Sequence, residues 1–213
     1  MTTTMRAKIE SLRKLIASQF SVTTQEITDR ALEFAVKRLE GYTRYNGRAL
    51  VEHSIEVARI VIEEVGLGRN SAAAALLHDV VRIAHKELPS EEFKGFIGEI
   101  RTNFGEEVAG ITMGLCDISG LKLKTSKEQA DDFRDMIVAY SEDPRVILIK
   151  LADRLEVMRS LAMFPLSKHR KKSWESLNLY AQIAHKLGLY SIKSELEDLA
   201  LKYLEPQDYN HIC

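Results

Sequence analysis

Apolar residues return every three or four positions along almost the whole chain, and the apolar–polar alternation of a strand is nearly absent. This spacing turns one side of a helix toward a core, whereas a strand needs a period of two. In the segment 5–20, for example, Leu12 and Ile16 fall on one stripe. The periodicity therefore predicts an all-α fold, a bundle of roughly ten helices.

Caps and helix breakers set the expected helix ends. Asp143-Pro144 is the clearest start, because Asp can cap a first turn and Pro is tolerated at its first position. Asn70 or Ser71 is the expected cap of a buried, alanine-rich helix. The stretch 117–127 is rich in Gly and Lys and predicts a loop. The remaining helices are expected over 24–39, 50–65, 72–84, 90–104, 106–116, 126–140, 143–163, 168–187 and 191–204.

The composition is that of a globular domain without a charge bias. Of the 213 residues, 45% are hydrophobic and 29% are charged, and the formal net charge is −1. With a pI near 6.6, the chain lacks the basic field of a dedicated nucleic-acid binder. No internal repeat or linker-like break is visible, so we expect a single domain over residues 1–205.

No sequence signal directs the chain to a membrane or to an oxidising compartment. The first residues lack the apolar stretch of a secretory signal, and no apolar run approaches about 18 residues. Two cysteines, Cys116 and Cys213, are too few for a disulfide framework. We therefore expect a cytoplasmic protein.

Four ionisable residues occupy positions where the periodicity expects core side chains. His53 shares a helical face with Val57, His78 and Asp79 adjoin in a run of alanines and leucines, and Asp153 interrupts another apolar run. A buried carboxylate is costly unless it is paired or bound to a cation. Two imidazoles and two carboxylates suit a divalent ion such as Mn, Fe, Zn or Mg. We therefore predict a shared metal site.

Each of these residues also has a simpler structural explanation. A single buried histidine is commonly a hydrogen-bonded core residue, and Asp153 has Arg154 and Arg159 nearby in sequence as ion-pair partners. The adjacent pair His78-Asp79 fits this alternative less well. All four residues together favour the metal site.

The order His … His-Asp … Asp resembles the HD phosphohydrolase superfamily, and longer motifs are similar to the hydrolase domain of the RelA/SpoT family. That family domain is all-helical and removes the 3′-pyrophosphate from guanosine tetra- and pentaphosphate. The resemblance implies that His53, His78, Asp79 and Asp153 hold a divalent metal, Mn²⁺ in the family. The matching motifs are AALLHDVV (74–81), FGEEVAGIT (104–112), DPRVILIKLADRL (143–155), MRSL (158–161), AHKLG (184–188) and ELEDLALKYLEPQDY (195–209).

The chain departs from the family pattern at positions that follow the predicted metal ligands closely in sequence. Active members carry Glu-Asp one turn after the HD pair, where this chain has Arg82 and Ile83. A carboxylate there can activate the attacking water, which neither an arginine nor an isoleucine can do. The family's His-Asn is likewise replaced by Glu156 and Val157. We therefore expect Arg82 and Ile83 not to be catalytic and hydrolysis to be weakened or lost, with His85 as an alternative base.

The resemblance also indicates substrate contacts in an altered turn. Where the family tends to read Arg-Lys-Ser-Gly-Glu-Pro-Tyr, residues 44–50 read Arg-Tyr-Asn-Gly-Arg-Ala-Leu. The candidate contacts to guanosine tetra- or pentaphosphate, or to a related nucleotide, are Arg44, Tyr45, Asn46, Arg159 and Lys168.

Three functions remain open from the sequence. The first is a metal-dependent pyrophosphohydrolase-type domain with weakened or lost hydrolysis. The second is a non-catalytic, regulatory or nucleotide-sensing domain of a longer (p)ppGpp synthetase, and the third is an HD phosphatase for another nucleotide. Bifunctional family members continue into a synthesising domain, so residues 206–213 are expected to begin a linker toward one.

Overall fold

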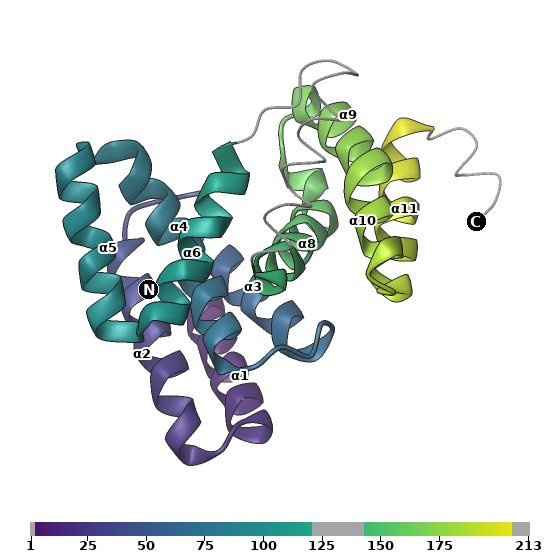
Figure 1. Ribbon diagram of the computed structural model, residues 1–213. Coiled ribbons are helices and arrows are strands. Elements are labelled where there is room, and N and C mark those ends of the chain that lie inside the picture. Colours follow the sequence, from purple (N-terminus) through teal and green to yellow (C-terminus); the bar gives the residue numbers. More distant parts are fainter. Residues whose placement is uncertain (1–2, 121–142, 206–213) are drawn as a thin grey trace. The chain divides into compact units, whose positions relative to one another are not determined.

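The computed structural model describes residues 3–120 and 143–205, and these are predominantly helical (Figure 1). Among them, the one β feature is an isolated antiparallel bridge between Thr43 and Ala49. None of the described helices is long and apolar enough to cross a membrane. The predicted all-α fold is confirmed for this part of the chain.

The chain divides into two compact units, which are described separately. Unit 1 comprises Met1–Thr43 and Ala49–Ile149, and unit 2 comprises Arg44–Arg48 and Lys150–Cys213. The single domain over residues 1–205 stays a prediction. The expected linker over 206–213 lies outside the described residues.

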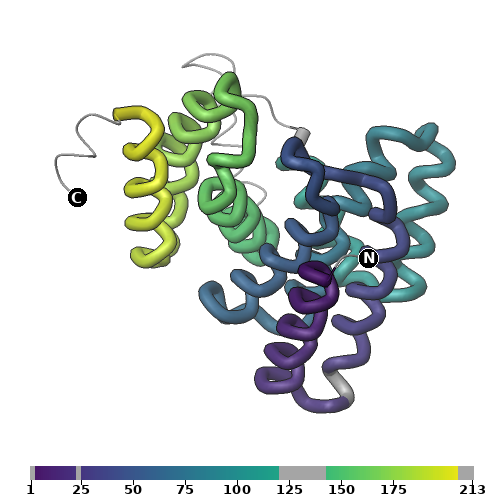
Figure 2. The backbone as a smooth tube through the Cα atoms, turned by 180° about the vertical axis from the view of Figure 1, so that it is seen from behind, coloured from purple at the N-terminus to yellow at the C-terminus, as the bar shows by residue number. Residues whose placement is uncertain are grey.

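Helix α4 is the central element of unit 1, where it contacts α2, α3 and α6 (Figure 1, Figure 2). Every residue over 71–81 is buried, because α4 is apolar nearly all round and its small alanines let neighbouring helices approach. The pair His78-Asp79 is therefore enclosed by the core. The described helices of this unit are α1 (Thr3–Gln19), α2 (Val22–Arg38), α3 (Leu50–Glu63), α4 (Arg69–Glu87), α5 (Ser90–Phe104), α6 (Glu106–Gly120) and the first residues of α8 (Pro144–Arg159).

Unit 2 is built from the rest of α8 and a set of shorter helices. Helix α11 packs against both α9 and α10. A π-helical turn joins α9 to α10, so the helical path continues through the segment predicted over 168–187. The elements after α8 are η1 (Leu161–Met163), α9 (Leu166–Glu175), η2 (Ser176–Tyr180), α10 (Ala181–Lys186) and α11 (Tyr190–Leu204).

Two helix starts show where capping arguments succeed and fail. Asp143 Oδ1 accepts a hydrogen bond of 3.0 Å from the backbone N–H of Arg145, so the predicted cap of α8 is confirmed. Helix α4 instead begins at Arg69 with Gly68 as its N-cap, so the predicted cap at Asn70 or Ser71 is wrong. Both residues lie inside the helix.

The predicted loop over 117–127 is wrong in its first part. Helix α6 continues to Gly120, so residues 117–120 are helical. The remainder of this stretch and the helix predicted over 126–140 lie outside the described residues.

Candidate metal centre

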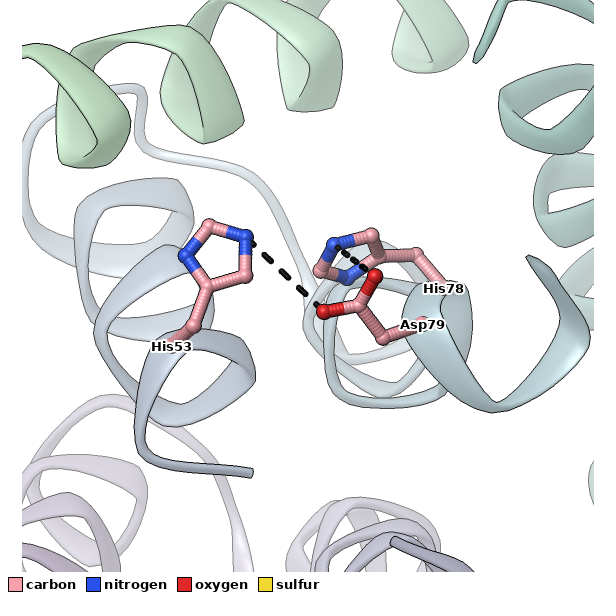
Figure 3. Close-up of side chains that lie close together, drawn as sticks. All are labelled: His53, His78 and Asp79. Carbon is pink, nitrogen blue, oxygen red and sulfur yellow. Dashed lines mark ion pairs between the residues drawn. The ribbon is translucent and has the colours of Figure 1, made fainter. Parts of the chain in front are cut away.

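Two neighbouring helices bring three predicted metal ligands together in unit 1 (Figure 3). His53 comes from α3, and His78 and Asp79 come from α4. The centroids of the two imidazole rings are 5.3 Å apart. Asp79 Oδ2 lies 4.0 Å from His53 Nε2, and Asp79 Oδ1 lies 3.6 Å from His78 Nε2. One carboxylate thus faces both rings.

A backbone contact decides which nitrogen of His78 can bind a metal. Its Nδ1 lies 2.6 Å from the carbonyl oxygen of Ala75, within the same helix. A carbonyl oxygen can only accept, so Nδ1 carries the hydrogen and donates it. In the neutral ring, Nε2 then keeps its lone pair near Asp79. Metal-ligating histidines are commonly oriented by such a second hydrogen bond.

The three side chains fit the requirements of a divalent cation. One donor atom from each can be chosen so that all lie within 4.8 Å of one another, and all three side chains are buried. Two ligands of one first-row ion, each about 2.1 Å from it, are separated by at most about 4.2 Å. The 3.6 and 4.0 Å separations meet this condition, each with a different oxygen of Asp79. The 4.8 Å spread of the full set exceeds about 4.2 Å, so a small closure is needed for all three to bind one ion. Imidazole and carboxylate donors suit Mn, Fe or Zn.

Arg82 binds the carboxylate of this cluster. Its Nε donates a hydrogen bond of 2.7 Å to Asp79 Oδ1, and its Nη2 lies 2.6 Å from the same oxygen. The two residues are three positions apart on α4, which places them on one face of the helix. The Arg82 side chain is 43% exposed and that of Asp79 only 4%. Arg82 therefore extends from the buried cluster toward solvent.

Two further residues of α4 bear on the predicted loss of a base. Ile83 is half-buried and offers no group that can exchange a proton. His85 is exposed, and its ring contacts the edge of Phe93 from α5 at 4.9 Å between centroids. This packing suits an ordinary helix-end histidine, and a catalytic role for His85 stays a prediction.

The fourth predicted ligand, Asp153, belongs to unit 2. Its Oδ2 accepts a hydrogen bond of 2.7 Å from Lys150 Nζ, one helical turn earlier on α8. Burial disfavours the charged form of Lys150, but the charge and hydrogen bond of Asp153 together with Tyr180 outweigh burial, and the pKa of Lys150 is raised. The sequence suggests Arg154 or Arg159 as the ion-pair partner of Asp153, and the structure provides Lys150. Metal binding by Asp153 stays a prediction.

A second buried charge cluster in unit 2 is not visible in the sequence. Arg154 Nη2 lies 3.0 Å from Glu175 Oε2, and the guanidinium lies 4.2 Å from the ring centroid of Tyr180. Lys172 Nζ lies 5.2 Å from the ring centroid of Phe164. Burial, together with repulsion by Arg154, lowers the pKa of Lys172 to about 8. Only the packing of α8 against the following helices joins these residues.

The altered turn is held within unit 2 by Arg44. Its Nη1 donates a hydrogen bond of 2.8 Å to Glu156 Oε1, and its Nη2 donates one of 3.1 Å to Ser160 Oγ. The guanidinium also lies 5.0 Å from the ring centroid of Phe164. Gly47 closes the turn with a φ of 76°, a conformation that other residues rarely adopt. Glu156 thus neutralises the first predicted nucleotide contact.

The other substrate candidates make contacts of their own in unit 2. Tyr45 is 64% exposed in this turn, and Asn46 Oδ1 accepts a hydrogen bond of 3.1 Å from a backbone N–H. Arg159 donates two hydrogen bonds, of 2.6 and 2.7 Å, to the Glu195 carboxylate. Lys168 is exposed near the start of α9. Their role in substrate binding stays a prediction.

Comparison with known proteins supports the motifs found in the sequence. Residues 31–190 match the HD domain family. The guanosine-3′,5′-bis(diphosphate) 3′-pyrophosphohydrolase of Aquifex aeolicus is 39% identical over 203 residues, which cover 95% of this chain. The bifunctional (p)ppGpp synthase/hydrolase SpoT of Escherichia coli is 36% identical over 204 residues, also 95% of this chain. A GTP pyrophosphokinase of Myxococcus xanthus is 36% identical over 188 residues, or 86% of this chain.

These relatives are much longer proteins. The alignments cover 27%, 28% and 24% of their respective lengths, so the chain spans about a quarter of each. The resemblance to the RelA/SpoT hydrolase domains is confirmed for this portion.

Proposed function

Because this chain belongs to the HD domain family, we propose that it is a metal-dependent guanosine-3′,5′-bis(diphosphate) 3′-pyrophosphohydrolase-type domain with weakened or lost hydrolysis. The proposal is carried by one observation: His53, His78 and Asp79 form a buried donor set, and an arginine occupies its edge. The donor set favours metal and nucleotide chemistry. The arginine disfavours turnover.

The proposed site uses the chain's residues in distinct ways. His53, His78, Asp79 and Asp153 would hold the cation, for which we propose Mn²⁺. When bound, such a cation supplies charge neutralisation at phosphoryl oxygens and a more acidic water. Arg82 stays protonated and cannot accept the proton of that water.

The nucleotide turn also departs from an active arrangement. A guanidinium such as that of Arg44 is suited to bind a phosphate through two parallel hydrogen bonds. Here, two of its nitrogens donate to Glu156 and Ser160 instead. A nucleotide that used Arg44 would have to displace these contacts, and the negative charge of Glu156 would oppose its phosphates.

The second candidate is a non-catalytic, nucleotide-sensing domain of a longer (p)ppGpp synthetase. It is favoured by the pairing of Arg82 with Asp79, because Arg82 stands at the position of the first residue of the family's Glu-Asp pair. A domain of this kind would bind metal and nucleotide without hydrolysing the nucleotide.

A hydrolysis assay combined with a binding measurement tests both candidates. Purified protein is incubated with Mn²⁺ and guanosine tetraphosphate, and pyrophosphate release is compared with that of a His78→Ala control. We expect a rate near that of the control, together with nucleotide binding that titration calorimetry detects. Rapid turnover would contradict the proposed loss, and absence of both turnover and binding would contradict both candidates.

A restoration experiment tests the assigned cause of this loss. The double substitution Arg82→Glu with Ile83→Asp returns the family's carboxylates to α4. Because a general base typically contributes about 10²–10⁴-fold, we expect the rate to rise on that order. An unchanged rate, with the variant folded by circular dichroism, would locate the defect elsewhere.

A further inference from the structure

We infer that Arg82 competes with a divalent cation for the Asp79 carboxylate and thereby sets the metal affinity of this site. The inference rests on the proposed function, because it takes His53, His78 and Asp79 as the metal ligands. It goes beyond the loss of a base. It assigns Arg82 a role in metal binding itself, which takes place without any nucleotide.

Arg82 contacts the same oxygen of Asp79 that a metal shared with His78 would use. Asp79 Oδ1 is the oxygen nearer to His78 Nε2, at 3.6 Å, and Arg82 places two nitrogens within 2.7 Å of it. A cation shared by Asp79 and His78 would need a lone pair of the same oxygen. While Arg82 stays in place, the cation would also stand close to its positive charge, and like charges at short range in a buried site repel strongly.

The surroundings of Arg82 allow its side chain to move away from Asp79. Its side chain is 43% exposed, whereas the Asp79 side chain is 4% exposed and fixed inside the cluster. A long arginine side chain at a helix surface can reorient into water at little cost. The Arg82 guanidinium and a bound cation would therefore be alternative counter-charges for the buried carboxylate.

The competition predicts opposite effects on the two states of the protein. Removing the guanidinium should tighten metal binding, because the cation no longer displaces a partner or meets its repulsion. The same change should destabilise the protein without metal, because the buried Asp79 then lacks its ion pair with Arg82. A purely structural role for Arg82 would predict only the second effect.

The test is Mn²⁺ binding to the intact chain, followed by electron paramagnetic resonance of the free ion and by calorimetry, without nucleotide. We expect Arg82→Gln to bind Mn²⁺ about 10- to 100-fold more tightly than the parent, the range over which neighbours of metal ligands act. Arg82→Lys, which keeps the charge, should remain near the parent. In EDTA, Arg82→Gln should melt at a lower temperature, and Mn²⁺ should raise its melting temperature by more.

Two controls make the result specific. Arg59→Gln removes the same charge from the exposed pair with Glu63 on α3 and should leave Mn²⁺ affinity unchanged. Asp79→Asn should abolish binding. If Asp79→Asn abolishes binding but Arg82→Gln leaves the affinity unchanged, the competition is refuted and the metal site stands. If neither the parent nor Arg82→Gln binds Mn²⁺, the metal site of the proposed function fails and the inference fails with it.

Discussion

The metal centre of unit 1 holds two buried imidazoles and a buried carboxylate with an arginine at its edge, whereas unit 2 pairs largely buried lysine and arginine side chains with carboxylates. In unit 2, Lys150 pairs with Asp153 and Arg154 pairs with Glu175, each within 3.0 Å. These charges balance one another inside the protein. In unit 1, the Arg82 guanidinium pairs with Asp79, and a bound cation would take its place.

This difference separates structural charges from functional ones. A buried ion pair with good geometry is self-contained, and removing one partner leaves an uncompensated charge. A cluster of imidazoles around one carboxylate has the donor types of a metal site, and its stability should respond to the metal content of the solution. The predictions below compare the two units on this basis, beginning with the largest expected effect.

The largest contrast is between Glu175→Gln in unit 2 and Asp79→Asn in unit 1. Glu175→Gln leaves the buried Arg154 without its carboxylate and should lower the free energy of unfolding by about 3 kcal/mol, with or without Mn²⁺. Asp79→Asn should cost less in EDTA, because Arg82 is half-exposed and can turn to water. It should instead remove the gain of about 2.7 kcal/mol expected at Mn²⁺ concentrations of about 100 Kd.

Urea unfolding, monitored by circular dichroism, measures both changes. Glu99→Gln is the matched control, because its pair with Arg38 is exposed and should contribute no more than about 1 kcal/mol. If Glu175→Gln lowered the free energy of unfolding no more than this control, the pair of Arg154 and Glu175 would not be a main source of stability in unit 2.

The second prediction concerns the arginine of the nucleotide turn. Glu156→Gln removes the negative charge that holds Arg44 and should strengthen the binding of guanosine tetraphosphate by about tenfold, the value of one charged hydrogen bond. Calorimetry at fixed salt concentration measures the change.

Glu195→Gln provides the control for this prediction, since it releases Arg159 from a bidentate pair with half-exposed side chains. A larger gain from Glu195→Gln than from Glu156→Gln would make Arg159, rather than Arg44, the main phosphate contact. No gain from either would argue against both residues as nucleotide ligands.

The smallest expected effect is the pH dependence caused by Lys172. Burial and the neighbouring Arg154 lower its pKa from 10.5 to about 8, so the charged form is disfavoured in the folded state. Between these values the unfolded chain binds more protons, and stability should therefore rise with pH through this window. Lys172→Met should lack this rise and be about 1–2 kcal/mol more stable than the parent at neutral pH.

Urea unfolding at neutral pH and at about pH 10 tests this prediction. Lys171→Met serves as the control, because Lys171 is exposed and its neighbouring position should confer no such dependence. A Lys172→Met variant whose stability follows the parent at both pH values would show that the ammonium is well solvated.

Local sequence patterns were sufficient for the parts of the molecule that helix geometry alone controls. The period of the apolar residues predicts the helices, and the apolar run around His78 and Asp79 predicts that α4 is buried. The spacing of three residues also places Arg82 on the face of Asp79, because a helix repeats every 3.6 residues. Even here, the end of a helix was less certain: α4 begins before the predicted caps, where Gly68 precedes it.

The sequence by itself therefore determined the all-α class, the HD resemblance and the neighbours that share a helix face, since these depend on a few consecutive residues. Only the tertiary structure decided which distant residues meet. His53 joins His78 and Asp79 because α3 packs on α4, Arg44 finds Glu156 from 112 positions away, and Arg154 finds Glu175 across a helix boundary. Such pairings depend on how helices pack, and the local periodicity that predicts each helix does not specify its partners.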